Sequence, residues 1–150
     1  EKRGIFVVRN KEPEKGIAHS VVLGLKAVSH SFKSGTDRKS GAPDGILFSV
    51  CDQPKLKIST IQRILNDAAL HKKNVICAGY RGQKGNPVLW PAHCFAELLE
   101  LTGDEGGRQM LTKYEEKVRI IETSREELKD IDSKRDLENL GKETEENKKA

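Results

Sequence analysis

Aromatic residues, long apolar runs and pairable cysteines are all scarce in this sequence of 150 residues. Phe, Trp and Tyr together make up 5% of the residues, too few for the stacking platform with which proteins bind single-stranded nucleic acid. No apolar stretch approaches the roughly 20 residues that a membrane-spanning helix requires. Cys51, Cys77 and Cys94 are odd in number and irregularly spaced, which favours a reducing, cytoplasmic compartment. We therefore expect neither a nucleic-acid partner nor a membrane partner.

Hydrophobic residues make up 35% of the sequence and are concentrated in short runs of alternating type. The predicted strands are 5–8, 46–50, 75–78, 88–90 and 118–121, and the predicted helices are 18–31, 59–70, 95–101, 108–111 and 136–140. Short continuous apolar runs such as 5–8 are typical of buried strands. Residues 35–43 are predicted to form a flexible loop. Strands that alternate with helices predict an α/β fold with a mainly parallel sheet.

Asp52 directly follows the second predicted strand, in the sequence Cys51-Asp52-Gln53-Pro54. Ligands of open α/β sheets bind at the carboxyl ends of the strands, and a carboxylate at this place suits Mg²⁺ held over a phosphate. Asp at a strand end also caps the turn into a following helix. Position alone leaves both roles open.

A second acidic pair, Asp130 and Asp132, lies in the sequence Asp130-Ile131-Asp132-Ser133. Alternate residues of an extended segment project to the same side, so that both carboxylates can face one site. Asp132 or Ser133 also fits the N-cap of the helix predicted to follow. A helix cap and a metal ligand are compatible roles.

Two glycine-rich segments are candidate ligand loops. Segment 82–87 allows close approach of the backbone to a ligand. Segment 103–108 places backbone N–H groups and Arg108 at a helix N-terminus, where anions bind. Because glycine-rich turns are common in proteins, a purely structural role stays open for each segment.

Five motifs follow one another along the chain: Gly16-Ile17-Ala18-His19-Ser20, Val50-Cys51-Asp52-Gln53-Pro54, Gly85-Asn86-Pro87-Val88-Leu89, Gly103-Asp104-Glu105-Gly106-Gly107-Arg108 and Asp130-Ile131-Asp132-Ser133. In this order they resemble the motifs of the molybdenum cofactor cytidylyltransferases, a group of the molybdenum cofactor nucleotidyltransferase-like superfamily. The resemblance covers nearly all of the segment 5–140. It implies a three-layer α/β/α, Rossmann-like nucleotidyltransferase fold over 1–140, followed by a charged, frayed tail over 141–150.

The resemblance also implies an activity and a set of roles. Members of the group transfer CMP from CTP to the molybdopterin cofactor and release pyrophosphate, and a molybdoenzyme is a candidate acceptor of the product. By similarity Asp52 is the principal Mg²⁺ ligand, Asp132 the second, and Asp130 supports them. The other implied site residues are Gly16 and Ser20 against the nucleotide, and Gly85, Asn86, Asp104 and Arg108 along the side where the pterin phosphate enters.

One element of the family pattern has no counterpart in these 150 residues. Members begin with a strand and a glycine-rich loop, roughly Leu-Ala-Ala-Gly-x-Ser-x-Arg-Met-Gly, whose backbone donors and basic side chains hold the triphosphate. We therefore expect the chain by itself to be weakly active or inactive. We also expect the sheet to have an unpaired edge that promotes self-association.

Other functions remain open at this point. A guanylyltransferase, or a sugar-phosphate or alcohol-phosphate nucleotidyltransferase of the same superfamily, shares most of these motifs. A module that binds a pterin cofactor without transferring a nucleotide is an alternative of a different class. Such a module is expected to ignore CTP, so separate titrations with nucleotide and pterin distinguish the two classes.

Overall fold

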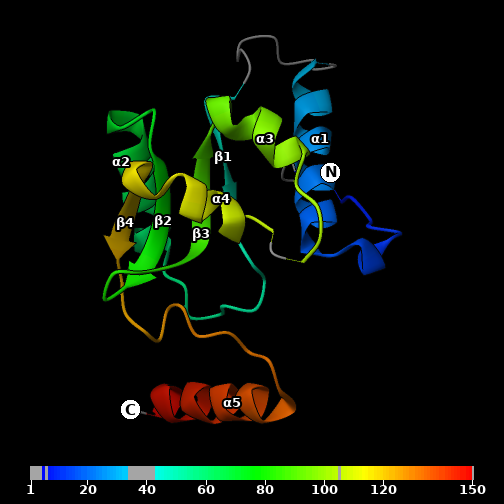
Figure 1. Ribbon diagram of the computed structural model, residues 1–150. Coiled ribbons are helices and arrows are strands. Elements are labelled where there is room, and N and C mark those ends of the chain that lie inside the picture. The colour runs from blue at the N-terminus through cyan, green and yellow to red at the C-terminus, as the bar shows by residue number, and fades with distance from the viewer. Residues whose placement is uncertain (1–4, 6, 34–42, 105, 150) are drawn as a thin grey trace.

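The structure is a computed structural model that describes residues 5, 7–33, 43–104 and 106–149. A four-stranded sheet in the order β1-β3-β2-β4 lies at its centre (Figure 1). The strands are β1 (Gly45–Phe48), β2 (Val75–Tyr80), β3 (Gln83–Pro91) and β4 (Val118–Glu122). β3 is antiparallel to β1 and β2, whereas β2 and β4 are parallel. The sheet is therefore mixed: three strands share one direction and β3 opposes them.

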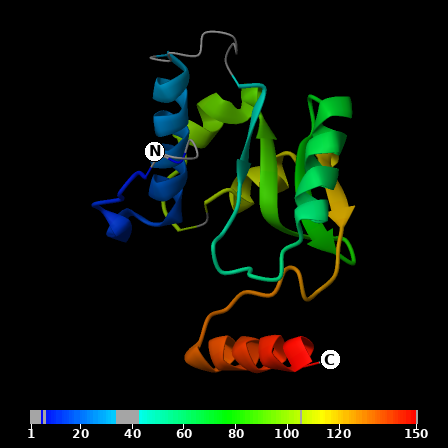
Figure 2. The ribbon, with the colours of Figure 1, turned by 180° about the vertical axis from the view of Figure 1, so that it is seen from behind.

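Helices cover both faces of this sheet. They are α1 (Ile17–Lys33), α2 (Ile58–Leu70), α3 (Phe95–Leu99), α4 (Arg108–Lys113) and α5 (Lys134–Lys149), with 3-10 turns at Pro13–Lys15, Ala92–Cys94 and Glu115–Lys117. Figures 1 and 2 show α2 on one face and α3 and α4 on the other, with α1 beside α3. α5 lies apart from these layers (Figure 1). The predicted three-layer α/β/α fold is confirmed.

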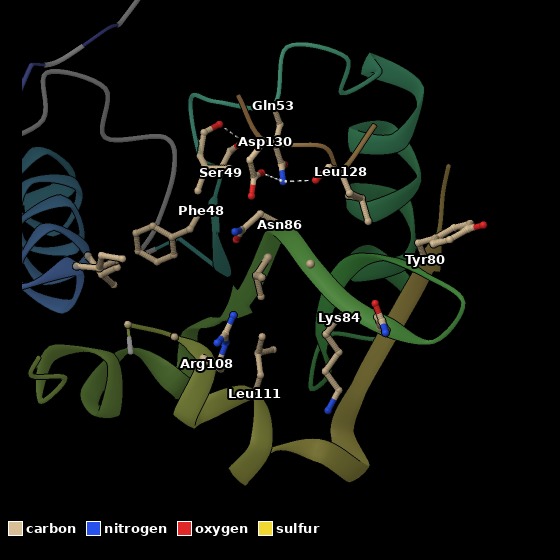
Figure 3. Close-up of a pocket in the computed structure, with 18 of the residues that line it drawn as sticks. Phe48, Ser49, Gln53, Tyr80, Lys84, Asn86, Arg108, Leu111, Leu128 and Asp130 are labelled. Carbon is tan, nitrogen blue, oxygen red and sulfur yellow. Dashed lines mark hydrogen bonds between the residues drawn. The ribbon is translucent and has the colours of Figure 1, made fainter. Parts of the chain in front are cut away.

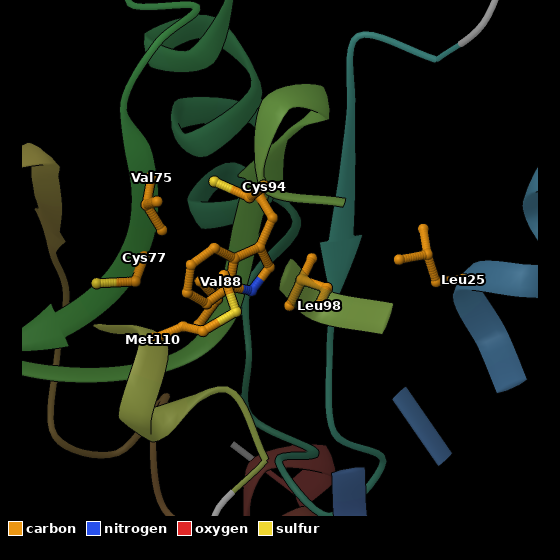
Figure 4. Packing of buried hydrophobic residues seen from close by; sticks show 8 residues of the cluster. Leu25, Val75, Cys77, Val88, Cys94, Leu98 and Met110 are labelled. Atoms are coloured by element: carbon orange, nitrogen blue, oxygen red, sulfur yellow. The ribbon is translucent and has the colours of Figure 1, made fainter. Parts of the chain in front are cut away.

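The core follows from the alternation of side chains along each strand. On β2, Val75 and Cys77 face the cluster shared with α1, α3 and α4 (Figure 4), whereas Ile76 and Ala78 face the cluster beneath α2. β3 alternates in the same way, since Trp90 packs into the first cluster and Leu89 into the second. Burial of these apolar side chains on both sides is what holds the helices against the sheet.

The strand predicted at 5–8 is wrong. Residues 5, 7 and 8 form no strand, and Ile5 is 69% exposed and Val7 91% exposed. Residue 6 lies outside the described residues. Within the described part of the chain, β1 ends the strand order and pairs with β3 alone. Among the described residues, no strand lies beside residues 5, 7 and 8 to supply hydrogen bonds and burial, and apolar composition alone does not make a strand.

The glycine-rich segment 82–87 was predicted as a loop before a short strand, and this prediction is also wrong. β2 and β3 form a hairpin in which Tyr80 pairs with Gln83. The two turn residues, Arg81 and Gly82, have positive φ angles of 50° and 77°, as the tightest hairpin turns require. β3 therefore begins at Gln83 and includes Gly85 and Asn86. These residues belong to a strand.

The remaining predicted elements are found with shifted ends. The two long helices and the strands at 46–50, 75–78 and 118–121 correspond to α1, α2, β1, β2 and β4. Residues 34–42 of the predicted loop lie outside the described residues. α5 starts at Lys134 and continues through the charged tail to Lys149; fraying of that tail stays a prediction. Within the described part of the chain, no helix has the length and apolar character needed to cross a membrane.

Candidate functional site

The site is organised around the sheet edge where β1, β2 and β4 end. Because these three strands share one direction, their carboxyl ends meet at one edge, and antiparallel β3 brings its N-terminal residues to the same edge. The turn after β1 carries Asp52, and the segment after β4 carries Asp130 and Asp132. Ligands of α/β sheets bind at this kind of edge.

Hydrogen bonds join the two acidic segments. The backbone N–H of Ile131 donates to the carbonyl of Asp52 over 2.9 Å. The side chain of Gln53 donates to Asp130 Oδ1 over 2.9 Å and to the Leu128 carbonyl over 3.3 Å (Figure 3). The two segments that carry the predicted metal ligands are thus in contact, although they are far apart along the chain; that they share a metal site stays a prediction.

A buried carboxylate anchors the segment after β4 to the start of α2. Glu127 is 5% exposed and accepts hydrogen bonds from Thr60 Oγ1 at 2.6 Å and from the backbone N–H of Lys57 at 3.2 Å. Burial acts to raise the pKa of Glu127, but hydrogen bonds from Thr60, Thr123 and Lys57 outweigh it and lower the pKa from 4.5 to about 2. Glu127 is therefore ionised at neutral pH and supports the acidic segment.

A cleft of about 1440 Å³ opens beside the joined acidic segments. Its polar lining includes the predicted site residues Ser20, Gly85, Asn86, Asp104, Arg108 and Asp130. In Figure 3 Asn86 lies between Asp130 on one wall and Arg108 on the other. Val88, Trp90 and Leu111 supply apolar lining. A cleft with an apolar base and a few convergent polar groups is typical of a small-molecule site.

Gly16 sits where α1 meets the turn that begins at Gly103. Its φ is 84°, and a Cβ at this position would lie 2.5 Å from both Asp104 Oδ1 and the Gly103 carbonyl. The N–H of Ala18 donates to the same carbonyl over 3.1 Å. Gly16 and Asp104, which the sequence assigns to different subsites, are thus in contact at one end of the cleft.

Asn10 holds the first turn of α1 in place. Its Nδ2 donates to Ser20 Oγ over 3.0 Å, and its Oδ1 accepts from the Glu12 backbone N–H over 2.9 Å and lies 3.1 Å from His19 Nδ1. Ser20, a predicted nucleotide contact, therefore already accepts a hydrogen bond, and no acceptor for its own O–H is found among the described residues, so that this O–H can donate to a ligand.

The predicted metal ligands are three carboxylates on the surface of the molecule. Asp52, Asp130 and Asp132 are all exposed, and among the described residues no group of three or more His, Cys, Asp or Glu is arranged to hold a metal ion. Mg²⁺ commonly binds through one or two carboxylates, with the remaining positions taken by water and substrate phosphates. Carboxylate oxygens of this kind suit a divalent cation whose remaining ligands are water and phosphate oxygens.

Comparison with known proteins identifies the fold. A family model described as the MobA-like NTP transferase domain matches residues 1–118. The chain belongs to this family. MobA-like NTP transferases are nucleotidyltransferases, so the predicted superfamily and the general enzyme class are both supported. The family match does not decide the nucleotide base or the acceptor.

Individual relatives agree with this assignment. The purine catabolism protein PucB of Bacillus subtilis (strain 168) is 28% identical over 101 residues, which cover 67% of this chain and 43% of PucB. The crystal structure of Rv0371c from Mycobacterium tuberculosis H37Rv matches with a TM-score of 0.63 and 23% identity, over 82% of this chain and 58% of that one. The crystal structure of a homologue of Rv0371c from Mycobacterium sp. strain JC1 matches with a TM-score of 0.56 and 25% identity, and the match covers 75% of this chain and 56% of that one.

Two features of these matches bear on the site. The chain spans about half the length of the relatives it matches, between 43% of PucB and 58% of Rv0371c. A further structure of Rv0371C was solved as a complex with manganese; it is 22% identical and covers 75% of this MobA-like chain and 57% of that one, with a TM-score of 0.55. At this level of identity the likeness shows the fold alone.

Sequence reasoning missed the residues whose hydrogen bonds hold the segments of the site together. Gln53, Glu127 and Asn10 each join segments that are separate in the sequence. Gln53 stands beside Asp52 within a recognised motif, but the motif does not reveal that its side chain turns inward. Glu127 lies in the charged stretch after β4, where exposure is the usual expectation for Glu. Only the packing of α2 shows that it is buried.

Proposed function

We propose that this MobA-like domain transfers CMP from CTP to a molybdopterin-type cofactor and releases pyrophosphate. The observation that carries the proposal is the hydrogen-bonded contact between the Asp52 turn and the Asp130 segment beside a cleft of about 1440 Å³. Because the chain spans only part of its relatives, the proposal concerns the whole protein's reaction. The free cysteines Cys51, Cys77 and Cys94 are consistent with a cytoplasmic enzyme.

In this proposal Asp52 and Asp132 hold Mg²⁺, with Asp130 in support. All three are oxygen donors of the kind that Mg²⁺ prefers, and their open arrangement leaves room for phosphate oxygens. A bound divalent cation would neutralise charge on the triphosphate and on the departing pyrophosphate. No protein nucleophile is needed, because positioning and charge stabilisation supply most of the rate enhancement in phosphoryl transfer.

The other predicted residues divide between the two substrates. Gly16 and Ser20 are proposed to contact the nucleotide, where close backbone approach and the free Ser20 O–H suit a base or ribose. Gly85, Asn86, Asp104 and Arg108 are proposed to face the pterin substrate. The Arg108 guanidinium is permanently charged and suits a phosphate group. In Figure 3 it points from the wall of the cleft toward Asn86.

The first test is calorimetric titration of the chain with CTP in the presence of Mg²⁺. Binding is expected for the wild type and for Asp44→Ala, and its loss is expected for Asp52→Ala. Asp44 and Asp52 are both exposed and lie at opposite ends of β1, so Asp44→Ala controls for the loss of one surface charge. Equal binding by all three variants would place the metal elsewhere and contradict the proposal.

Two further titrations decide between the alternatives of substrate. Tighter binding of GTP than of CTP would indicate a guanylyltransferase instead of a cytidylyltransferase. Binding of molybdopterin without any response to CTP would indicate a pterin-binding module that transfers no nucleotide. The proposed function requires both CTP and the pterin to bind, and it requires Asp52→Ala to weaken the first without abolishing the second.

A further inference from the structure

Gln53 is a buried polar side chain placed between the two acidic segments. It is 9% exposed, and its Nε2 donates to the Leu128 carbonyl and to Asp130 Oδ1 (Figure 3). Both partners are acceptors, which fixes the orientation of the amide because only the NH₂ group can serve them. Gln53 Oε1 is buried and has no hydrogen-bond partner in the described part of the chain. The side chain is thus held by its donor end alone.

The hydrogen bond from Gln53 to Asp130 connects the neighbourhoods of two predicted metal ligands. Gln53 follows Asp52 directly, so a bond from its side chain to Asp130 links the places of two predicted metal ligands. The bond from Ile131 N–H to the Asp52 carbonyl links the same two segments through the backbone. Together the two bonds restrict both the separation of the segments and the rotation of the Asp130 carboxylate.

We propose that Gln53 is a positioning residue that orients Asp130 relative to Asp52 at the cation site. This inference rests on the proposed function, in which these carboxylates bind a divalent cation. A hydrogen bond to a ligating carboxylate fixes the orientation of its oxygens, and loss of such a bond commonly weakens metal binding by about 10- to 100-fold. The unused oxygen of Asp130 remains available to the cation.

A general supporting role for Gln53 would predict something different. The segment after β4 has a second attachment, from Glu127 to Thr60 and Lys57, and no hydrogen bond of this attachment reaches Asp130 among the described residues. If Gln53 only held the segment in the fold, loss of either attachment would have the same effect on the cation site. If Gln53 orients Asp130, loss of the Gln53 hydrogen bond will weaken cation binding strongly, and loss of the Glu127 attachment will not.

The test compares Gln53→Met with Thr60→Val in the full chain. Met and Val keep nearly the volume of the residues they replace while removing the donor group. The affinity for Mn²⁺, measured by electron paramagnetic resonance, is expected to fall about 10-fold or more in Gln53→Met and less than threefold in Thr60→Val. Relaxation of the backbone ¹⁵N of Ile131 is expected to report greater mobility in Gln53→Met alone.

Each other outcome overturns the inference. Equal loss of Mn²⁺ affinity in both variants would show general loosening, and unchanged affinity and mobility in Gln53→Met would show that its bond to Asp130 has no consequence. If Gln53→Met does not fold, Gln53→Asn is used, because its amide is one methylene too short to reach Asp130. If the wild type binds no Mn²⁺, the proposed function fails and the inference fails with it; if the wild type binds Mn²⁺ and Gln53→Met binds it equally well, the inference fails alone.

Discussion

At the scale of single residues, Glu127 shows how a charge can be kept inside a small domain. Removal of a carboxylate from water is costly unless hydrogen bonds replace the lost solvation. Thr60 Oγ1, the Lys57 N–H and Lys57 Nζ, the last at 3.3 Å, supply that replacement. The same contacts attach the start of α2 to the segment that carries Asp130. Glu127 therefore links the stability of the fold to the shape of the site.

This arrangement predicts how stability depends on pH. Because the folded-state pKa of Glu127 is lowered to about 2 from 4.5, its contribution is fully present above pH 4.5 and is lost as the pH falls toward 2. Glu127→Gln is expected to lower the free energy of unfolding by about 1–3 kcal/mol at pH 6. Urea unfolding at pH 6, 4 and 3 should show that the difference in free energy of unfolding between wild type and variant decreases as the pH falls. A difference independent of pH would contradict the prediction.

Gly16 is a second residue whose identity is set by geometry. With a φ of 84° and no room for a Cβ, it allows α1 to begin against the turn at Gly103. Gly24 lies inside α1, and a Cβ there would meet only Phe48 Cε1 at an ordinary 3.9 Å. The two glycines therefore differ in what a methyl group would do.

Gly16→Ala is expected to destabilise the fold by about 1–3 kcal/mol, from backbone strain and from contact with Asp104. Gly24→Ala is expected to stabilise it by up to about 1 kcal/mol, because Ala is the better helix former. Thermal unfolding of both variants measures the contrast. Destabilisation by Gly24→Ala as large as that by Gly16→Ala would show that α1 tolerates no added side chain at either place.

At the scale of elements, the segment 5–8 and the strand β2 look alike in sequence and differ in structure. Both are short β-branched apolar runs, yet Val7 is 91% exposed and Ile76 is fully buried. β2 is an inner strand with partners on both sides, whereas segment 5–8 has none among the described residues. Whether these two segments form strands therefore depends on the presence of adjacent strands in the fold, and not on their own sequence.

Substitutions at the two places should therefore have opposite consequences. Val7→Lys is expected to change the free energy of unfolding by less than about 0.5 kcal/mol, as for other exposed positions. Ile76→Ala is expected to cost about 2–5 kcal/mol, because it leaves a cavity between β2 and α2. Chemical denaturation of the two variants is the measurement. A large cost for Val7→Lys would indicate that segment 5–8 is buried in solution.

The long helices α1 and α2 were predictable from their apolar periodicity, and the strands β1, β2 and β4 from short continuous apolar runs, because both signals lie in the local sequence. The course of β3 was not, since Gly85 and Asn86 enter the sheet through the hairpin turn at Arg81 and Gly82 and not through apolar character. An unpaired sheet edge was expected from the family resemblance, and among the described residues β1 pairs with β3 alone. Self-association through that edge stays a prediction.

At the scale of the whole molecule, the sequence motifs include many of the residues around the cleft but do not show how these residues come together. The segments that carry Asp52 and Asp130 are in contact because β1 and β4 end at the same edge of the sheet. This follows from the sheet topology and cannot be read from the spacing of the motifs along the chain. Gly16 and Asp104 meet because α1 begins beside the turn before α4. The supporting contacts of Gln53 and Glu127 arise only once these elements are packed.

The shared direction of β1, β2 and β4 also distinguishes the two ends of the sheet. The Asp52 turn, Asn86 and the segment that carries Asp130 lie toward the end where β1, β2 and β4 finish, while the turn between α2 and β2, with its exposed lysines Lys72 and Lys73, lies at the other. A tether attached at that turn would hold the chain with its cleft facing away from a surface. The fold thus offers an attachment point for immobilised binding assays at the end of the sheet opposite the acidic segments.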